Sequence, residues 1–206
     1  MRTNAGRREP CPGLRELDAA AFTAGLDPLM DVYQAAMGVA AVQLPGRRAI
    51  MQAHTAHPAF RALIVTETPQ GAARETGADP GPVVAFGYGF HGGRGQWWHD
   101  LVRSALISRW GHAAAIEWLD DSFEVAEVHV HPGYQRRGIG RRLLYLLTGG
   151  RAERTAVLST MDTNSPARRL YRSLGFTDLL TGYRFSGAPV PYAVMGAALP
   201  LLTTRS

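Results

Sequence analysis

The sequence contains no lysine and only one cysteine. All 22 of its basic residues are therefore arginines, and they are scattered in pairs instead of forming one long basic run. The net charge of +5 suits an anionic ligand, but the scattered arrangement argues against nucleic acid as a partner. Because Cys11 has no second cysteine to pair with, an intramolecular disulfide and a cysteine-based zinc site are both excluded.

Long apolar runs are also lacking. No apolar stretch approaches the roughly 18 residues that a membrane-spanning helix needs, and the first residues lack the apolar core of an export signal. These absences predict a cytoplasmic protein with no membrane partner. His54 and His57 are metal-ligand types three residues apart, but no third ligand follows at a useful spacing, so we expect no metal.

The rest of the composition is that of a globular protein, with 206 residues of which 46% are hydrophobic and 19% charged. Residues 1–13 are polar and arginine-rich and contain two prolines, which predicts a disordered tail. We therefore expect one domain over residues 14–206.

Hydrophobic periodicity, proline and glycine predict the elements of the first half. Residues 14–22 form a weak strand or turn, and a helix runs over 28–37 with Asp27 as its N-cap and Gly38 after its end. A second helix covers 47–54, strands cover 60–66 and 83–90, and a loop covers 69–82. Gly87 and Gly89 indicate a bulge or a close backbone approach in the second of these strands.

The second half continues the alternation of strands and helices. Residues 92–121 predict a helical insertion, with a helix over 96–106 that contains Trp97 and Trp98. Such a long connection is typical of a lid or binding element, or it covers a sheet edge with its tryptophans in the core. Strands are expected at 123–130, 156–160, 183–185 and 192–198, helices from 141 and from 166, and a tail from 199.

The segment 123–147 has the most informative pattern. An apolar strand ends at His131-Pro132-Gly133, a turn rich in glycine and arginine follows, and a leucine-rich helix begins. The first turn of a helix has unpaired N–H groups and a positive dipole end, which together bind anions. Glycines at 138 and 140 let a phosphate approach closely, and the nearby arginines add charged donors. The pattern predicts a phosphate-binding turn.

Two motifs also carry a family resemblance. Gln135-x-x-Gly138-x-Gly140 after the strand, and Asn164 to Phe176 with the spacing Asn-x-x-Ala-x-x-x-Tyr-x-x-Leu-Gly-Phe, resemble the two signatures of the GCN5-related N-acetyltransferase (GNAT) family. The resemblance implies an α/β fold with a mixed, mainly antiparallel sheet flanked by helices, and it implies acetyl-CoA as acyl donor. The residues that it assigns to the cofactor are Val128, His129, Val130, Gln135, Arg136, Arg137, Gly138, Ile139, Gly140, Arg141, Asn164 and Tyr171.

Acetyl transfer to an amine needs a base, because an amine of pKa near 10 is neutral only about one time in a thousand at pH 7. Glu124 and Glu127 are the candidates. A period of two places Glu124 with Val128 on one face of the strand and Glu127 on the other, but a bulge would exchange the faces. Glu124 is favoured, because by register from Gln135 it occupies the position of the base in several relatives. His129 and His131 are further candidates as proton relays.

The resemblance and the residues together define the expected reaction. Tyr171 is the candidate acid that protonates the departing thiolate. Trp97 and Trp98 are candidate walls of the acceptor site, and five acidic residues (Glu117, Asp120, Asp121, Glu124 and Glu127) predict an acidic patch that attracts a cationic amine.

We therefore expect acetyl transfer to a primary amine, favouring a small molecule. The alternatives are another acyl-CoA, an oxygen acceptor, or a non-catalytic CoA-sensing module. Exposed final strands in this fold also leave a homodimer as an alternative to a monomer.

Overall fold

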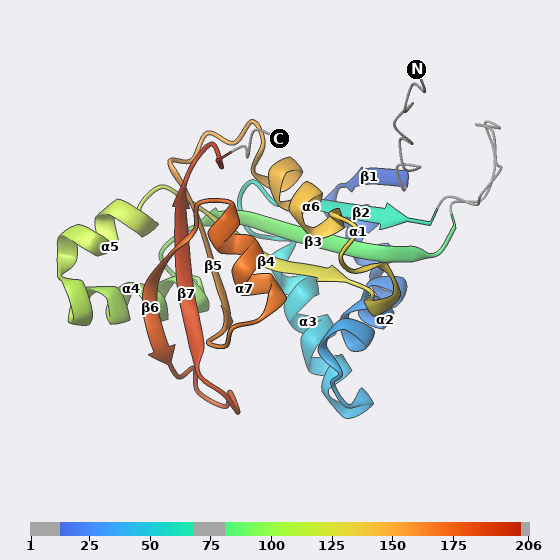
Figure 1. The fold of residues 1–206 in the computed structure, drawn as a ribbon, viewed down its shortest axis with the longest axis horizontal. Coiled ribbons are helices and arrows are strands. Elements are labelled where there is room, and N and C mark those ends of the chain that lie inside the picture. Colours follow the sequence, from blue (N-terminus) through green and yellow to red (C-terminus); the bar gives the residue numbers. More distant parts are fainter. Residues whose placement is uncertain (1–12, 68–80, 203–206) are drawn as a thin grey trace, which may run out of the picture.

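The computed structural model describes residues 13–67 and 81–202, which form a seven-stranded sheet of order β1-β2-β3-β4-β5-β7-β6 (Figure 1). Every neighbouring pair is antiparallel except β4 and β5, so the expected mixed, mainly antiparallel α/β fold is confirmed. The strands are β1 (Gly13–Leu17), β2 (Arg61–Thr66), β3 (Val83–Gly92), β4 (Ser122–Val130), β5 (Thr155–Met161), β6 (Thr177–Tyr183) and β7 (Tyr192–Ala198).

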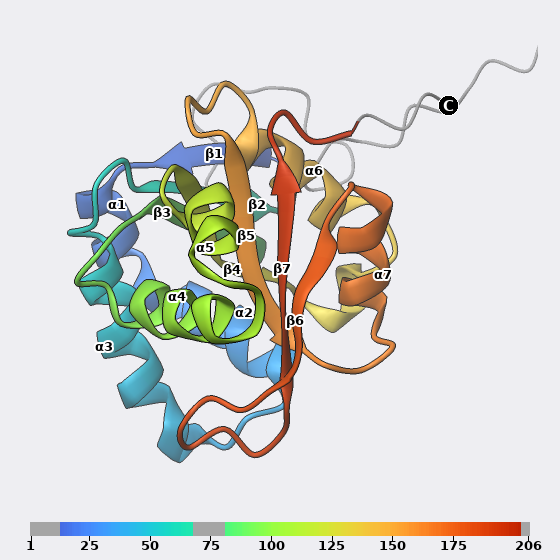
Figure 2. The same cartoon turned by 90° about the vertical axis from the view of Figure 1, so that its left-hand side faces the viewer.

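Helices cover both faces of this sheet (Figure 2). They are α1 (Ala19–Ala24), α2 (Leu26–Met37), α3 (Leu44–His54), α4 (Trp97–Trp110), α5 (His112–Leu119), α6 (Ile139–Thr148) and α7 (Pro166–Ser173). Two short 3-10 helices occupy Ala41–Gln43 and Pro132–Tyr134. Helices α6 and α7 pack over one face through a single core cluster, whereas α1–α3 and α4–α5 pack over the other face through two separate clusters.

A β-bulge interrupts β4. Glu127 lies opposite Tyr88 of β3, whereas Val125 lies opposite Gly89, so that Ala126 has no partner of its own. A side chain at Gly89 would be impossible here, because its Cβ would lie 2.3 Å from the carbonyl oxygen of Glu124. The close backbone approach expected from this glycine is therefore confirmed.

The bulge changes which residues share a face. Phe123 and Val125 belong to the core under α6, and Val128 and Val130 pack against that same core. The strict alternation predicted for the strand is therefore wrong beyond Val125, and the alternative with a bulge is correct. An extra residue shifts the parity of every side chain that follows it.

Strands β4 and β5 separate soon after they begin. They pair only over Ser122–Glu124 and Thr155–Val157, at a parallel register, and then diverge (Figure 1). The later part of β4 is hydrogen-bonded to β3 on one side and does not pair with β5 on the other. This divergence leaves an opening in the sheet beside Val128–Val130.

The insertion at 92–121 forms α4 and α5, which lie against the half of the sheet made of β5, β6 and β7 (Figure 2). Its buried residues Val102, Leu106 and Leu119 pack on Val157 and Val194. The insertion therefore covers a sheet face instead of an edge. Its tryptophans are not core residues, since Trp97 is 63% exposed and Trp98 is partly buried.

Several predicted boundaries were wrong. A short helix, α1, follows β1 where a continuous strand or turn was expected, and α3 begins at Leu44. The N-cap of α2 is Gly25, and Asp27 lies in the first turn, where its carboxylate accepts from Arg48. Helix α6 starts at Ile139 because Gly138 already adopts a left-handed cap conformation. Strand β6 ends where the 183–185 strand was predicted to begin, at Tyr183.

Two predictions concern residues outside the described ranges. The tail expected to be disordered, with Cys11, lies outside them except for Gly13, which begins β1. Most of the loop expected at 69–82 also lies outside them. In the described part of the chain, no helix combines the length and apolar character needed to cross a membrane.

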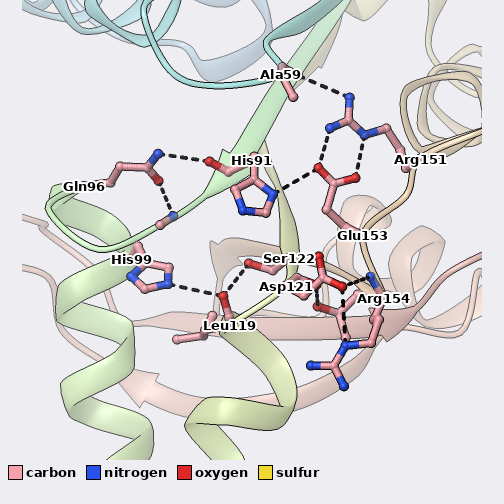
Figure 3. A network of polar contacts seen from close by, with 12 residues as sticks. Ala59, His91, Gln96, His99, Leu119, Asp121, Ser122, Arg151, Glu153 and Arg154 are labelled. Atoms are coloured by element: carbon pink, nitrogen blue, oxygen red, sulfur yellow. Dashed lines mark hydrogen bonds and ion pairs between the residues drawn. The ribbon is translucent and has the colours of Figure 1, made fainter.

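A polar network holds the ends of β3, β4 and β5 together, away from the opening (Figure 3). Glu153 accepts from Arg151 and lies 3.2 Å from His91 Nδ1, while Arg151 also donates to the carbonyl of Ala59. Burial by itself raises the pKa of Glu153, but the hydrogen bonds and charge of Arg151, a backbone hydrogen bond and the hydrogen bond of His91 together outweigh it and bring the pKa down to about 2. The network therefore joins the β2 entry, the end of β3 and the β5 entry.

We predict that Glu153→Gln lowers the free energy of unfolding at pH 7 by about 1 kcal/mol or more. Because the folded pKa is depressed, this contribution is present above the unfolded value of about 4.5 and is lost as the pH falls toward 2. Urea unfolding of both proteins should show the full difference at pH 7 and its progressive loss between about pH 4.5 and 2. A difference that stays constant across this range would contradict the ion pair as its cause.

Candidate active site

The turn between β4 and α6 has the geometry of an anion site. Gly138 is the N-cap of α6, with φ of 77°, and it has no side chain to cap the first helical turn. A Cβ at this position would meet no atom within 4 Å, so the space in front of the turn is open. Arg136, with φ of 62°, and Arg137 are exposed beside it. The structure thus brings the predicted phosphate-binding residues to the start of a ten-residue helix.

The other predicted residues of this turn have structural contacts. The Gln135 side chain donates to the carbonyl of Val130, and Arg141 donates to Ser173 of α7. A Cβ at Gly140 would lie 3.3 Å from Leu170 of α7. Its small size therefore serves the packing of α6 against α7.

Helix α7 brings the second motif to the same face. Ser165 caps it by accepting from the Arg168 N–H, while Asn164 is exposed just before the cap and accepts from Arg169. Buried Arg168 pairs with Asp162 and Asp178, which ties α7 to β6 and to the end of β5. The two motifs are held as one surface on the α6–α7 face.

A pocket of about 430 Å³ lies on the opposite face, over the place where β4 leaves β5. Its walls come from α3, the end of β3, the start of α4, and strands β4 and β5. The lining residues are Arg47, Ile50, Ala53, His54, His57, Phe90, Gln96, Trp97, Trp98, Glu124, Val125, Ala126 and Ser159. This volume falls within the range of small-molecule sites, roughly 300–1,000 Å³.

Glu124 is the acidic residue that lines this pocket. The residue is 5% exposed, and its Oε2 has no hydrogen-bond partner among the described residues. Burial raises the pKa of the Glu124 carboxyl to about 8. A carboxyl with such a pKa in a pocket can exchange a proton near neutral pH, which is what a general base needs.

Glu127 has a different environment. It accepts from Arg47 at 2.9 Å and from the His129 ring, whose Nε2–H donates to its other oxygen. Burial by itself raises the pKa of Glu127, but the charges and hydrogen bond of His129 and Arg47 lower it overall. Arg47 also lies over the Tyr33 ring, 5.3 Å from its centroid. Glu127 is thus the centre of an ion-pair network, and its oxygens are already used.

Tyr171 of α7 belongs to the core cluster under α6 and packs on Phe176. It is 9% exposed, and burial, with a smaller contribution from the negative charge of Glu127, raises its pKa to about 12. The charge of Glu127 therefore acts on Tyr171, although Glu127 is paired with Arg47 of α3 on the other face of the sheet.

The expected acidic patch does not exist as a patch. Asp120 pairs with Arg103 and Asp121 with Arg154, while Glu127 pairs with Arg47. Glu117 is exposed on α5. Only Glu124 of the five acids lines the pocket, together with both predicted tryptophans, Trp97 and Trp98.

The α3 wall of the pocket was not predicted from the sequence. Arg47, Ile50 and His54 line it at spacings of three and four residues, which is one face of a helix. That periodicity was the available signal, but nothing local indicated which face meets a ligand. His54 had been considered only as a metal ligand, and its Nδ1 lies 3.0 Å from the Tyr88 hydroxyl. Residues 13–67 and 81–202 contain no group of three potential metal ligands.

Comparison with known proteins gives a consistent family. Residues 99–178 match the family model described as an acetyltransferase (GNAT) domain. A GCN5-like protein acetyltransferase of Mycobacterium tuberculosis is 39% identical over 154 residues, which is 69% of this chain and 75% of that protein.

Solved structures share the fold at lower identity. A Salmonella typhimurium protein solved with acetyl-CoA as its cofactor has a TM-score of 0.55 at 20% identity, covering 95% of this chain and 98% of that one. The ribosomal-protein-S18-alanine N-acetyltransferase of Escherichia coli has a TM-score of 0.55 at 17% identity, covering 94% and 97%. The chain belongs to the GNAT family, a family of acetyl-CoA-dependent N-acetyltransferases.

Proposed function

We propose that this enzyme transfers the acetyl group to the primary amine of a small molecule, which enters the pocket above Glu124. One observation carries this proposal: a buried carboxyl with an unpartnered oxygen lies in a pocket at the point where β4 separates from β5. The pocket is on the α3–α4 face, and the two motifs for the donor are on the α6–α7 face. Donor and acceptor would thus meet through the opening in the sheet.

The residues of the α6–α7 face fit a diphosphate. The open space before Gly138, the uncapped first turn of α6 and the exposed Arg136 and Arg137 are what an anionic group requires. When bound there, acetyl-CoA supplies an activated acyl carbon. The unpaired side of Val128–Val130 offers backbone groups to the arm of such a ligand, and Asn164 and Tyr171 are proposed to contact that arm.

Glu124 is proposed as the general base. An amine enters as its ammonium form, and Glu124 takes a proton from it, leaving a nitrogen lone pair for attack on the acyl carbon. The raised pKa of about 8 makes Glu124 a stronger base than an ordinary carboxylate. Glu127 is proposed as a positioning residue, because His129 and Arg47 occupy both of its oxygens.

Tyr171 is proposed to act on the sulfur of the departing thiolate. Its pKa of about 12 exceeds the value of about 8.5 for a thiol, so complete transfer of its proton is unfavourable. A hydrogen bond from the phenol stabilises the developing thiolate, and the second proton lost by the amine nitrogen replaces any proton that the phenol gives up. The charge balance then requires one proton released for each acetyl group transferred.

A second candidate acceptor is a protein amine. The specific observation that favours it is the 39% identity to a relative named as a protein acetyltransferase. In that case the pocket would receive the end of a lysine side chain or an N-terminal residue. Acetylation of peptides and of free amines at matched concentrations distinguishes the two candidates.

We predict that Glu124→Gln lowers turnover by about 10²–10⁴-fold and leaves acetyl-CoA affinity unchanged. In the wild type, kcat/KM should rise about tenfold per pH unit below pH 8 and level off above it, because the amine and Glu124 share one proton. In the variant, the rise should continue toward the amine pKa near 10, because solvent must supply the neutral amine. Initial rates of thiol release from pH 6 to 10 test this, and identical profiles would remove Glu124 as base.

Tyr171→Phe should lower kcat by at least about tenfold while the dissociation constant of acetyl-CoA changes little, since the lost hydrogen bond forms mainly to the departing sulfur. The matched control is Tyr145→Phe. Tyr145 lies on α6, and its hydroxyl donates to the Leu202 carbonyl at 2.7 Å. Steady-state kinetics and calorimetry with acetyl-CoA separate the two effects. Equal losses in both variants would indicate a general destabilisation.

Gly138→Ala should weaken acetyl-CoA binding at least about tenfold, because its Cβ projects into the space proposed for the diphosphate and its φ is positive. Gly150→Ala is a matched control, since Gly150 has φ of 68° and equally open surroundings at the other end of α6. Both variants lose about 1 kcal/mol of stability from the left-handed conformation. Calorimetry in which both bind acetyl-CoA like the wild type would contradict the site.

A further inference from the structure

The polar groups around the pocket are mostly occupied by one another. Gln96 accepts from the Gly93 N–H and donates to the His91 carbonyl, and the Trp98 indole donates to Ser159 (the Gln96 contacts are drawn in Figure 3). His54 is paired with the Tyr88 hydroxyl, and Arg47 with Glu127. These partners leave little for an acceptor rich in hydroxyl or amino groups to bind.

The pocket also offers one place for a positive charge. Glu124 is the acid among its lining residues, and its Oε2 has no partner in the described part of the chain. Burial, then the neighbouring His57, lower the pKa of His54 to about 4, and burial lowers that of His57 as well. Both imidazoles are therefore neutral at pH 7 and add no charge to the walls.

The remaining lining is aromatic or aliphatic. Phe90 packs on the rings of His54 and His57, with centroids 5.0 and 4.5 Å apart. At the rim, Trp97 and Ile50 keep 63% and 45% of their surface exposed although both line the pocket. Exposed apolar residues that border a pocket are typical of a surface that an apolar ligand covers.

We infer that the acceptor is a monoamine with an apolar, preferably aromatic body, whose ammonium group lies at Glu124 and whose body lies against Trp97 and Ile50, the exposed apolar residues of the lining. This inference rests on the proposed function and narrows it to a substrate class. A second ammonium group on the acceptor would find no second unpaired carboxylate among the lining residues, so polyamines and polyamino sugars are disfavoured.

The test compares two amines with the same number of heavy atoms. Hexylamine and 1,5-diaminopentane differ only in that a terminal methyl is replaced by a second ammonium. Calorimetry with the protein saturated with CoA should show hexylamine and 2-phenylethylamine binding at least about tenfold more tightly than the diamine. From propylamine to hexylamine, each methylene should tighten binding about three- to fourfold.

Variants test the two contacts separately. Trp97→Ala should weaken 2-phenylethylamine binding severalfold. Trp110→Ala is the control, because Trp110 is a similarly exposed tryptophan of the same helix, at 57%, but does not line the pocket and donates to the Leu179 carbonyl of β6. Its removal should leave binding unchanged. Hexylamine binding at pH 7 should release close to one proton in the wild type and none in Glu124→Gln, as measured in buffers with different ionisation enthalpies.

Some outcomes overturn the inference without touching the proposed function. If the diamine binds as tightly as hexylamine, the acceptor class is wrong but acetylation of a small amine stands. If a lysine peptide is acetylated while the apolar amines do not bind, the inference fails together with the small-molecule acceptor, and the protein amine takes its place. If no amine releases CoA, the proposed function fails, and the calorimetric ranking still decides whether the pocket selects apolar monoamines.

Discussion

The β-bulge at Ala126 is the constraint on which the site depends. By adding one residue to β4 opposite Gly89, it lets Glu124 and Glu127 face the α3 side of the sheet, although an offset of three positions would put them on opposite faces of a regular strand. It also returns Val128 and Val130 to the core under α6. Without the bulge, one of the two glutamates would have to be buried among the leucines of α6. A bulge beside a functional site is a common device for turning a side chain to where it is needed.

The second condition is the divergence of β4 and β5. The two strands pair over only three residues, so the sheet is open beside the later part of β4, which carries Glu127 and Val128–Val130. Elements on the two faces can then contribute to one site. The negative charge of Glu127 on β4, for example, raises the pKa of Tyr171 on α7. The insertion of α4 and α5 steadies the β5–β7–β6 half of the sheet while its first turn contributes two tryptophans to the pocket.

The two glutamates of β4 illustrate how environment separates chemically identical groups. Glu127 has a guanidinium and an imidazole as partners, which outweigh its burial and stabilise its charge. Glu124 is buried without partners, which destabilises its charge and leaves it ready to take a proton or a cation. Glu127, a structural anion, and Glu124, a candidate base, are thus only three positions apart in the sequence.

Sequence alone determined the family resemblance, the strand–turn–helix motif and most of the secondary structure, because glycine, proline and hydrophobic period act locally. Gly138 is an example, since its left-handed cap conformation and the helix behind it depend only on neighbouring residues. The tertiary structure decided which glutamate is free and which is paired, since Arg47 reaches Glu127 from α3, 80 residues away, and the bulge turns Glu127 toward α3. It also turned the expected acidic patch into separate ion pairs and assembled the pocket from five distant elements. Ion pairs and cavities depend on which residues are neighbours in space, and those neighbours cannot be read directly from the order of residues along the chain.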